Sequence, residues 1–449
     1  MSRLNKNQNT ICVIGLGFVG LTVALSLANR GLQIVGVDKD KKTLNFLQSG
    51  KSHFYEPGIE KLLKKMIKNG KISFLSKIPK IKNINSYIIT VGTPIDQNNK
   101  IITKHIEIVA KELSSVLKNK DLVILRSTVG VGVTRKIVYP ILNSTNKKIN
   151  LSFCPERTLE GKALTELLQL PQIIGGLDLD SVKKSSKIFK NLTKKIICVS
   201  DLETAELIKL VDNSNRDVIF AYANEIAKIC DGYGVSASEV IKKGKKDYPR
   251  TNLPSPGLVG GPCLEKDPHI MSQSSIVQNH IYPKITMQAR SLNENLPIET
   301  IHYIKKFLTK KKIKIKSLNI LLAGIAFKGK PKTSDTRGTM AKIVISELKK
   351  IFVNPKIFGY DPAVKKSDII DLAIKPVVNF NKTAKSMNLI IILNNNPSFE
   401  KLELKNFYNC QKLSLVYDFW SNISSNSKEF KKNKYYISLG NHQKFKIND

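Results

Sequence analysis

A cysteine stands in a loop-forming stretch, GLVGGPCLEKDPH at 257–269, with Lys266 and Asp267 close behind it. A thiol acts as a nucleophile only when nearby positive charge or a helix N-terminus stabilises its thiolate. Lys266 would supply such a cation to Cys263, and Asp267 a possible acid or base, while the glycines permit close approach of a ligand. Taken alone, the stretch fits an inert thiol in a tight loop better than a reactive one.

A second set of polar residues lies on a long helical pattern that starts at Ser200 or Asp201 and runs to residue 230. Lys209 and Asn213 are four residues apart in this pattern, so they share one face of the predicted helix. A helix of about thirty residues is well above the usual length and is typical of a domain connector or an oligomer interface. Lys209 by itself is better explained as a solvated charge.

Two carboxylates, Glu156 and Glu160, follow the apolar strand pattern at 150–153. Their spacing turns both to the same side if the segment is helical. An ordinary acidic loop explains them as well, and so does a first helical turn, where glutamate suits the helix dipole.

The elements that must position these residues begin with a dinucleotide-binding pattern. A short apolar strand at 11–14 is followed by GLGFVG, a helical pattern at 21–30, Gly31 and a second strand ending in Asp38. The first glycine permits the tight turn, the second lets the backbone approach a pyrophosphate at the helix N-terminus, and the third lets helix pack on strand. Asp38 suits ribose hydroxyls and favours NAD, although the lysine after it keeps NADP as the alternative. The predicted cofactor-binding residues here are Gly15, Gly17, Phe18, Val19, Gly20 and Asp38.

Further strand patterns at 86–94 and 121–132 continue the alternation of strands and helices. In doubly wound sheets, ligands bind outside the carboxyl ends of the strands. Thr93 and Thr128 follow two such strands, so they are candidate ligand contacts. The alternative is that their hydroxyls cap neighbouring helices.

The last third, from residue 316, repeats strand, loop and helix, with further strands at 356–362, 388–394 and 413–420 and a short edge strand at 435–439. It has no G-x-G-x-x-G, so a second dinucleotide site is not expected. Lys328 and Arg337 lie in its first loop and suit phosphate groups. Ion pairing with Asp335 is the alternative for these two cations.

The composition restricts the class of protein. A chain of 449 residues with 41% hydrophobic residues predicts two or three folded domains. The formal net charge of +37 raises nucleic-acid or membrane-surface binding, but no zinc-finger spacing or aromatic-interleaved basic stripe accompanies it, and solvated lysines explain it better. The six cysteines form no C-x-x-C pair, which favours a reducing, cytoplasmic setting and no metal site. The uncharged run 11–28 is interpreted as strand, glycine turn and helix rather than as a membrane span.

These motifs together resemble the nucleotide-sugar 6-dehydrogenases, the family of UDP-glucose and UDP-N-acetylmannosamine dehydrogenases. The matching stretches cover nearly the whole chain in the family's order: GLGFVG at 15–20, YEPGIEKLL at 55–63, TVGTP at 90–94, RSTVGVG at 126–132, CPERTLEGKAL at 154–164, ELIKLVDNSNR at 206–216, GLVGGPCLEKD at 257–267 and GIAFKGKPKTSDTRGT at 324–339. The resemblance implies that NAD oxidises the C6 alcohol of a UDP-sugar to a carboxylate in two hydride transfers.

The resemblance also implies roles for the polar residues. Cys263 would be the nucleophile that binds the aldehyde as a thiohemiacetal, which the second oxidation turns into a thioester. Lys209 and Asn213 match residues that stabilise the oxyanion. Asp267, with Thr128, matches the group that orders a water and removes the alcohol proton.

Glu160 matches the carboxylate that activates water against the thioester, and Glu156 matches an acid of the same network. Lys266 is counted with Thr93 and Thr128 among the cofactor-binding residues. The residues expected to bind the sugar nucleotide are Glu156, Arg157, Lys209, Asn213, Arg216, Arg250, Gly260, Lys328 and Arg337.

Three features favour a UDP-N-acetylhexosamine as substrate: Pro-Glu-Arg at 155–157, Arg216, and Tyr-Pro-Arg at 248–250. Glu160 and the Lys-Asp pair at 266–267 look more like the UDP-glucose branch, which is the alternative substrate. A two-electron hydroxyacid dehydrogenase and a non-catalytic nucleotide-binding protein are the rivals from other classes.

The expected fold is α/β, with two Rossmann-like doubly wound domains joined by a helical region with a long central helix. The NAD-binding domain is expected at 1–200, the helical region at 201–305 and the UDP-sugar-binding domain at 306–449. By resemblance the central helix forms a homodimer or higher oligomer, and Arg250 reaches the partner subunit's site. No nucleic acid and no membrane insertion are expected.

Overall fold

A computed structural model of the chain describes residues 10–81, 83–144, 147–277, 282–313, 316–423 and 428–442. The chain forms two compact units, one containing the residues up to Asp212 together with His269–Pro283, the other containing Asn213–Pro268 and the residues from Lys284 onward. The boundary falls inside two helices, α8 (Leu202–Tyr233) and α10 (Asp267–Val277). The expected division at residues 200 and 305 stays a prediction.

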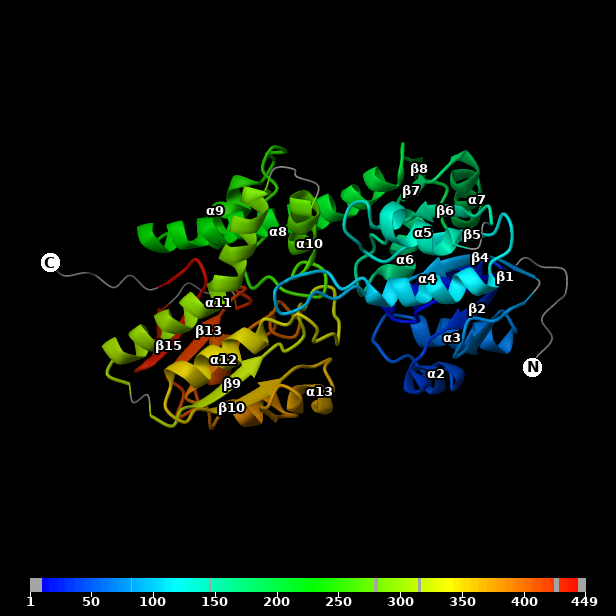
Figure 1. Ribbon diagram of the computed structural model, residues 1–449. Helices are drawn as coiled ribbons and strands as arrows, with labels where there is room; N and C mark the ends of the chain where they lie inside the picture. The colour runs from blue at the N-terminus through cyan, green and yellow to red at the C-terminus, as the bar shows by residue number, and fades with distance from the viewer. Residues whose placement is uncertain are drawn as a thin grey trace. The chain divides into compact units, whose positions relative to one another are not determined.

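The first unit is built on an eight-stranded sheet with the order β3-β2-β1-β4-β5-β6-β7-β8 (Figure 1). All neighbouring strands are parallel except β6 and β7. Its elements are β1 (Thr10–Ile14), α1 (Phe18–Asn29), β2 (Gln33–Val37), α2 (Lys41–Gln48), α3 (Ile59–Lys68), β3 (Ile72–Leu75), β4 (Ile84–Ile89), α4 (Lys104–Val116), β5 (Leu122–Leu125), η1 (Thr134–Val138), α5 (Tyr139–Asn143), β6 (Asn150–Phe153), α6 (Ala163–Gln169), β7 (Gln172–Gly176), α7 (Leu179–Phe189) and β8 (Ile196–Cys198).

Strand β1 shows why this sheet carries helices on both faces. All five of its residues are buried, and successive side chains point to opposite faces of a strand. Ile11 and Val13 belong to the core cluster that contains α1, whereas Cys12 and Ile14 belong to the cluster that contains α4. A strand that is apolar on both faces is stable only when helices cover both, which is the doubly wound arrangement.

The second unit contains a seven-stranded sheet with the order β11-β10-β9-β12-β13-β15-β14. Its elements are α9 (Ala237–Gly244), α11 (Lys284–Lys310), β9 (Asn319–Ala323), α12 (Ala341–Ile351), β10 (Lys356–Tyr360), α13 (Lys366–Ile370), β11 (Lys375–Pro376), α14 (Phe380–Ala384), β12 (Leu389–Ile392), η2 (Leu404–Phe407), β13 (Leu415–Asp418), β14 (Lys428–Lys431) and β15 (Lys434–Ser438). Ile320 and Leu322 of β9 pack into one core cluster, while Leu321 and Ala323 pack into another. This sheet is therefore doubly wound as well.

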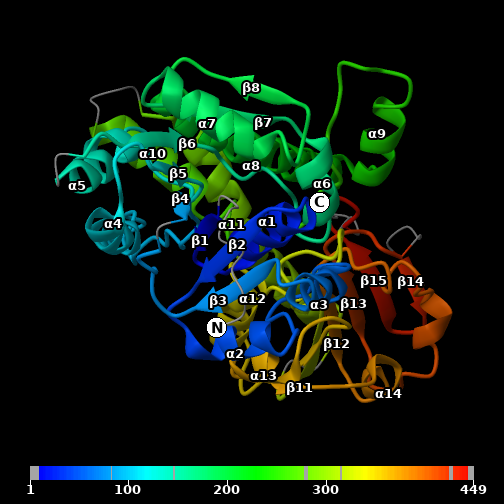
Figure 2. The same ribbon diagram turned by 90° about the vertical axis from the view of Figure 1, so that its right-hand side faces the viewer.

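The expected strand at 435–439 is present as β15, but its expected position at the edge of the sheet is wrong. Strand β15 lies between β13 and β14, is parallel to β13, and all five of its residues are buried (Figure 2). The edge is formed by the antiparallel strand β14. The residues around β15 are polar and lysine-rich, so the sequence alone suggested an exposed strand rather than a buried one.

The expected fold class, α/β with two doubly wound sheets and a long helix, is confirmed. Helix α8 extends over 32 residues, and the Asp201 carboxylate caps it by accepting from the Thr204 amide at 2.7 Å. The helix after the glycine turn begins at Phe18, three residues earlier than expected, and Gly31 has the positive φ of a helix-terminating glycine. Among the described residues, no helix is long and apolar enough to cross a membrane.

Candidate active site

The turn between β1 and α1 requires glycine at positions 15 and 20, whereas there is free space beside Gly17. A Cβ on Gly20 would lie 1.8 Å from the Gly15 carbonyl oxygen, and Gly15 itself has φ +90°. A Cβ on Gly17, the N-cap of α1, would meet nothing within 4 Å. The space above Gly17 is where the backbone can approach a pyrophosphate, so this turn fits a dinucleotide.

Asp38 holds this turn from the end of β2. Its Oδ2 accepts from the Leu16 amide at 2.7 Å and its Oδ1 from the Asp40 amide at 2.9 Å. The side chain is half-buried. A half-exposed carboxylate beside the open turn is suited to ribose hydroxyls. Phe18 and Val19, in the first turn of α1, are also half-buried.

The second sheet has a similar glycine turn and a following acid, but there the acid is buried. Gly324 has φ +92° and donates to the Tyr360 carbonyl at 2.8 Å, as Gly15 does to the Val37 carbonyl. The equivalent acid, Asp361, is 8% exposed and accepts from the amides of Ala326, Ala363 and Val364. Because main-chain donors surround this carboxylate, it is poorly placed for ribose hydroxyls.

Thr93 and Thr128 lie beyond the carboxyl ends of β4 and β5 in the first unit. The Thr93 hydroxyl is buried and donates to the Thr128 carbonyl at 2.6 Å. This bond joins the two strand tips, which is a structural role that the sequence did not indicate. The Thr128 side chain is half-buried.

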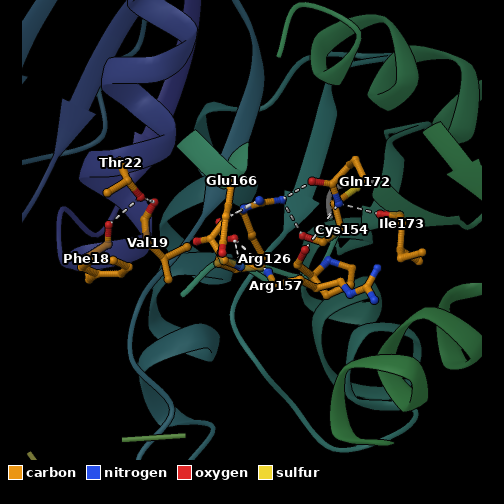
Figure 3. Close-up of polar contacts among 12 residues, drawn as sticks. Phe18, Val19, Thr22, Arg126, Cys154, Arg157, Glu166, Gln172 and Ile173 are labelled. Atoms are coloured by element: carbon orange, nitrogen blue, oxygen red, sulfur yellow. Dashed lines mark hydrogen bonds and ion pairs between the residues drawn. The ribbon is translucent and has the colours of Figure 1, made fainter. Parts of the chain in front are cut away.

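Glu156 is buried against Arg126, a residue whose role the sequence did not indicate. Arg126 donates to Glu156 Oε2 at 2.7 and 3.1 Å. It also donates to the Cys154 carbonyl at 3.0 Å and to Gln172 at 2.8 Å (Figure 3). Although burial works to raise the pKa of Glu156, the Arg126 charge and the donated hydrogen bonds hold it below its ordinary value. Glu156 is therefore an ionised acid locked in place.

The segment between β6 and α6 is not helical, so Glu156 and Glu160 do not share a helix face. It is an extended loop ordered from within, because Glu156 Oε1 accepts from the amides of Arg157 and Thr158 at 2.8 Å. Glu56 orders its other end by accepting from the amides of Gly161 and Ala163. The Glu160 side chain is half-buried between these two fixed points. Arg157 donates to Asp212 at 2.7 Å in this same unit.

Lys209 lies on α8 and is 8% exposed, which argues against a simple solvated charge. One turn earlier, Glu206 is fully buried and accepts from the Gly132 amide at 2.6 Å and from the Thr134 amide and hydroxyl at 2.9 and 2.5 Å. Burial raises the pKa of Glu206 to about 7. This carboxyl fixes the start of α8 against the loop after β5.

In the second unit, the structure brings the cysteine loop together with Asn213 and Asp267. The side-chain Nδ2 of Asn213 donates to Asp267 Oδ2 at 2.5 Å, and Lys266 Nζ lies 3.0 Å from Asp267 Oδ1. Asp267 is fully buried, whereas the Cys263 side chain is exposed. The Cys263 carbonyl accepts from the amides of Lys266 and Asp267, which places the thiol one turn before the first residue of α10. The accessible thiol and the buried carboxylate are therefore four residues apart in the chain, and the Asn213 side chain of α8 contacts that carboxylate.

The two glycines before Cys263 pack against the first loop of the second sheet. The Gly261 amide donates to the Gly338 carbonyl at 2.7 Å, and a Cβ on Gly260 would lie 2.3 Å from that same oxygen. Gly261 has φ +103°, and a Cβ there would meet the Phe327 ring at 2.4 Å. Both glycines are thus required by close approach of the two loops.

That loop carries the two cations predicted to bind phosphate. Lys328 Nζ lies 5.2 Å from the Phe327 ring centroid and is half-buried. Arg337 is exposed and forms a bidentate ion pair with Asp335, in which its Nη2 donates to Oδ2 at 2.6 Å and its Nε to Oδ1 at 3.0 Å. The ion-pair alternative for Arg337 is therefore present in this structure, and an exposed guanidinium still has donors to offer.

The two remaining arginines of the predicted site are on the surface of the second unit. Arg216 is exposed on α8. Arg250 is exposed after α9, where it donates to the Tyr248 hydroxyl at 3.1 Å and stacks on the Tyr248 ring at 4.7 Å. Both are available to a ligand or a second chain.

Doubly wound sheets, an open glycine turn with an acid at the next strand, and an accessible cysteine beside a buried Asn–Asp pair define the class: an NAD-dependent dehydrogenase with a second, nucleotide-binding Rossmann domain. The UDP-glucose/GDP-mannose dehydrogenase family matches in three parts, its NAD-binding domain at residues 9–193, its central domain at 203–295 and its UDP-binding domain at 321–425. The chain belongs to this family.

Individual relatives extend over most of the chain. It is 32% identical to the UDP-N-acetyl-D-mannosamine dehydrogenase of Methanococcus maripaludis, covering 89% of each chain, and 31% identical to that of Methanocaldococcus jannaschii, covering 93% and 94%. The structure of UDP-D-ManNAc dehydrogenase from Pyrococcus horikoshii superposes with a TM-score of 0.86 at 27% identity, covering 96% of this chain and 99% of the other. The corresponding enzyme structure from Staphylococcus aureus gives 0.79 at 25% identity, covering 96% and 98%.

Proposed function

We propose that the protein oxidises the C6 hydroxyl of a UDP-N-acetylhexosamine, with UDP-N-acetylmannosamine as the first choice and UDP-N-acetylglucosamine as the second. The observation that carries the chemistry is the buried contact between Asn213 of α8 and Asp267, which follows the accessible Cys263 by four residues. The choice of sugar rests on the relatives, which are named UDP-N-acetyl-D-mannosamine dehydrogenases. The residues Pro-Glu-Arg at 155–157 and Arg216 support the same choice.

The first oxidation needs a group that takes the alcohol proton. Asp267 is assigned this role, acting with Thr128 through an ordered water. The Asn213 side chain and the Lys266 ammonium each contact one oxygen of Asp267, so this carboxyl group is held in a fixed orientation. NAD, when bound, supplies the hydride acceptor for both oxidations.

The second oxidation needs a covalent adduct, because an aldehyde releases hydride readily only after a nucleophile has added to its carbon. The Cys263 sulfur forms a bond to the aldehyde carbon, and the carbonyl oxygen takes the thiol proton, which gives a thiohemiacetal. Loss of that proton and of the second hydride gives the thioester. Lys209 and Asn213 are assigned to stabilise the oxygen while it carries negative charge.

Hydrolysis completes the reaction. Glu160 takes a proton from the attacking water, the carbon–sulfur bond breaks, and Cys263 recovers its proton as the carboxylate leaves. Glu156 supports this step by fixing the main chain of the loop on which Glu160 lies.

The binding residues divide between the two sheets. Gly15, Gly17, Phe18, Val19, Gly20 and Asp38 would hold NAD at the first sheet, with Thr93, Thr128 and Lys266 contributing. Arg157, Arg216, Arg250, Gly260, Lys328 and Arg337 would hold the UDP-sugar. The cations suit its diphosphate because guanidinium and ammonium groups bind phosphate oxygens strongly.

A homodimer through α8 is part of the proposal. Tyr222, Ile229 and Tyr233 are 51%, 48% and 74% exposed and are spaced at seven and four residues, so they form one apolar stripe on the helix. A stripe of this kind is typical of a helix that packs against a partner. Light scattering of the wild type and of Tyr222→Glu/Ile229→Glu tests this part. A monomeric wild type would contradict it.

We place the enzyme in the cytoplasm, since all six cysteines are free and a reactive Cys263 requires a reducing compartment. Its substrate is proposed to be a nucleotide sugar rather than a polymer, despite the charge of +37.

The decisive experiment measures NADH formation with UDP-N-acetylmannosamine, UDP-N-acetylglucosamine, UDP-glucose and GDP-mannose, with NAD and with NADP. Two NADH per molecule of UDP-N-acetylhexosamine, and a uronic acid as product, are expected. Preference for UDP-glucose would replace the substrate assignment. One NADH per turnover would indicate a two-electron dehydrogenase, and tight binding without turnover of any sugar would contradict an enzymatic function.

A further inference from the structure

The loop that carries Cys263 is held from behind by side chains of two helices in the second unit. Asn224 of α8 makes a pair of hydrogen bonds to Gly257: its Nδ2 donates to the Gly257 carbonyl at 3.1 Å, and its Oδ1 accepts from the Gly257 amide at 2.8 Å. This side chain is fully buried. It fixes the start of the loop, six residues before the thiol.

Arg290 of α11 fixes the part of the loop that flanks the thiol. Its guanidinium donates to the Val259 carbonyl at 3.1 Å and to the Leu264 carbonyl at 2.9 Å. These two carbonyls lie on either side of Cys263 in the chain. One rigid planar group therefore sets the distance between the two ends of the segment that contains the nucleophile.

Arg290 is in turn immobilised. It is 1% exposed and pairs with Asp217 of α8, which is fully buried, at 2.9 Å. Asn293 donates to the same Asp217 oxygen at 3.0 Å and accepts from Asn224 at 3.0 Å. The four side chains form one buried network that joins both helices to the loop.

The cysteine loop also packs closely against the first loop of the second sheet. The Gly261 amide is bonded to the Gly338 carbonyl, and the Phe327 ring lies within 2.4 Å of the position that a Cβ on Gly261 would take. The loop is thus held by the side chains of Asn224 and Arg290, and it also packs against the main chain of Gly338 and the ring of Phe327. Its conformation depends on both supports.

We propose that Arg290 and Asn224 are positioning residues for Cys263, which hold the loop so that the sulfur attacks the bound aldehyde before the aldehyde can leave. The inference rests on the proposed function, because it assumes that Cys263 forms the covalent adduct. Covalent attack requires the reacting atoms to be held close together, and a small displacement of either one slows it by orders of magnitude. Asn224 and Arg290 bond to main-chain groups of the loop, and through these bonds they would set the position of the thiol.

Two variants test this role. Arg290→Lys keeps a positive charge for Asp217 but has no fork to bridge two carbonyls and a carboxylate. Asn224→Ser removes both bonds to Gly257 without touching a charge, and it carries the test should Arg290→Lys not fold. The matched control is Lys228→Gln, because the Lys228–Glu299 ion pair joins the same two helices away from the loop.

The first readout is hydrogen–deuterium exchange, which needs no substrate. The amides of residues 257–264 are expected to exchange ~10-fold faster or more in both variants and at the wild-type rate in the control. Peptides from α8 and α11 are expected to change by less than about twofold. Unchanged exchange in the loop would overturn the inference whether or not the enzyme is active.

The second readout is the balance between the two oxidations. A displaced thiol is expected to lower kcat by ~10-fold or more with KM for the sugar changed by less than about threefold, and to lower the NADH released per sugar from two toward one as free aldehyde escapes. A general loss of stability would lower the amount of active enzyme without changing that ratio. A variant with a loosened loop and a wild-type ratio would overturn the inference. A wild type that oxidises no UDP-sugar would contradict the proposed function instead, and the exchange measurement would then decide on the loop alone.

Discussion

Asn213 donates a hydrogen bond of 2.5 Å to Asp267, across 54 positions of the chain and between a long helix and the loop of the accessible cysteine. Asp267 is completely buried, yet its second oxygen lies 3.0 Å from Lys266 Nζ. A buried carboxylate is tolerated only when it is hydrogen-bonded and paired, and these two partners meet that requirement. The arrangement fixes a buried carboxylate four residues after Cys263 in the chain, and the proposed reaction assigns the role of base to this carboxylate.

Replacing this base should slow the first oxidation. Asp267→Asn keeps the size of the side chain but removes the negative charge, so no group takes the alcohol proton. We expect kcat for NADH formation to fall roughly 10²–10⁴-fold, the usual contribution of a general base. Asp180→Asn, at an exposed position on α7, serves as the control and should keep wild-type turnover. Wild-type turnover in Asp267→Asn would remove this residue from the mechanism.

Replacing the nucleophile should abolish formation of the acid. Cys263→Ser retains a hydroxyl in place of the thiol, but serine without an activating base adds poorly to an aldehyde. We expect production of uronic acid to fall roughly 10³-fold or more, as is found when nucleophiles of covalent enzymes are removed.

The matched variant for the thiol is Cys198→Ser on β8, because Cys198 is the other exposed cysteine among the described residues. Chromatography of the products checks both variants. If Cys263→Ser forms the acid at the wild-type rate, the thioester route is wrong.

Replacing Gly17 with alanine should weaken NAD binding, whereas replacing Gly20 with alanine should lower the stability of the fold. Gly17 has a conformation that alanine adopts and a Cβ there meets no protein atom, so Gly17→Ala should leave thermal stability unchanged while raising the Kd for NAD about tenfold or more, equal to ~1.4 kcal/mol. Gly20→Ala would place its Cβ 1.8 Å from the Gly15 carbonyl and should destabilise the unit by about 1–3 kcal/mol. Calorimetry of NAD binding and of thermal unfolding separates the two effects. Normal NAD affinity in Gly17→Ala would refute the assignment of this turn.

Glu206 should make the stability of the first unit dependent on pH. Its pKa rises from 4.5 in the unfolded chain to about 7 in the folded protein because it is buried. A raised carboxyl pKa means that its stabilising contribution is complete below about pH 4.5 and is lost as the pH rises through about 7. The shift corresponds to a change of up to about 3 kcal/mol.

Thermal unfolding of the wild type and of Glu206→Gln between pH 5 and 8 measures this effect. The wild type should lose stability with rising pH relative to the variant, which does not titrate. The stability contribution of Glu203 depends on pH in the opposite direction, because its hydrogen bond to Arg135 lowers its pKa. This contribution is lost only as the pH falls below about 4.5. Parallel pH profiles for the wild type and Glu206→Gln would contradict the prediction.

Much of the fold follows from short stretches of sequence. The strand, glycine turn, helix and acid at 11–38 are determined by the periodicity of apolar residues and by Gly15 and Gly20, where a larger residue is strained or does not fit. The second doubly wound sheet follows from the same alternation. The position of β15 does not, because only the neighbouring strands decide whether a five-residue strand lies inside a sheet or at its edge.

The sequence by itself determined which residues have the chemistry: the thiol of Cys263, the acids, and the lysine and asparagine one turn apart on a helix. Only the tertiary structure decided which groups meet. Asn213 with Asp267, Arg126 with Glu156, and Arg290 with the carbonyls around Cys263 are contacts between residues 26 to 54 positions apart. The physical reason is that conformational preferences act over a few neighbouring residues, whereas such pairs form only when helices and loops pack and each buried charge has to find a partner.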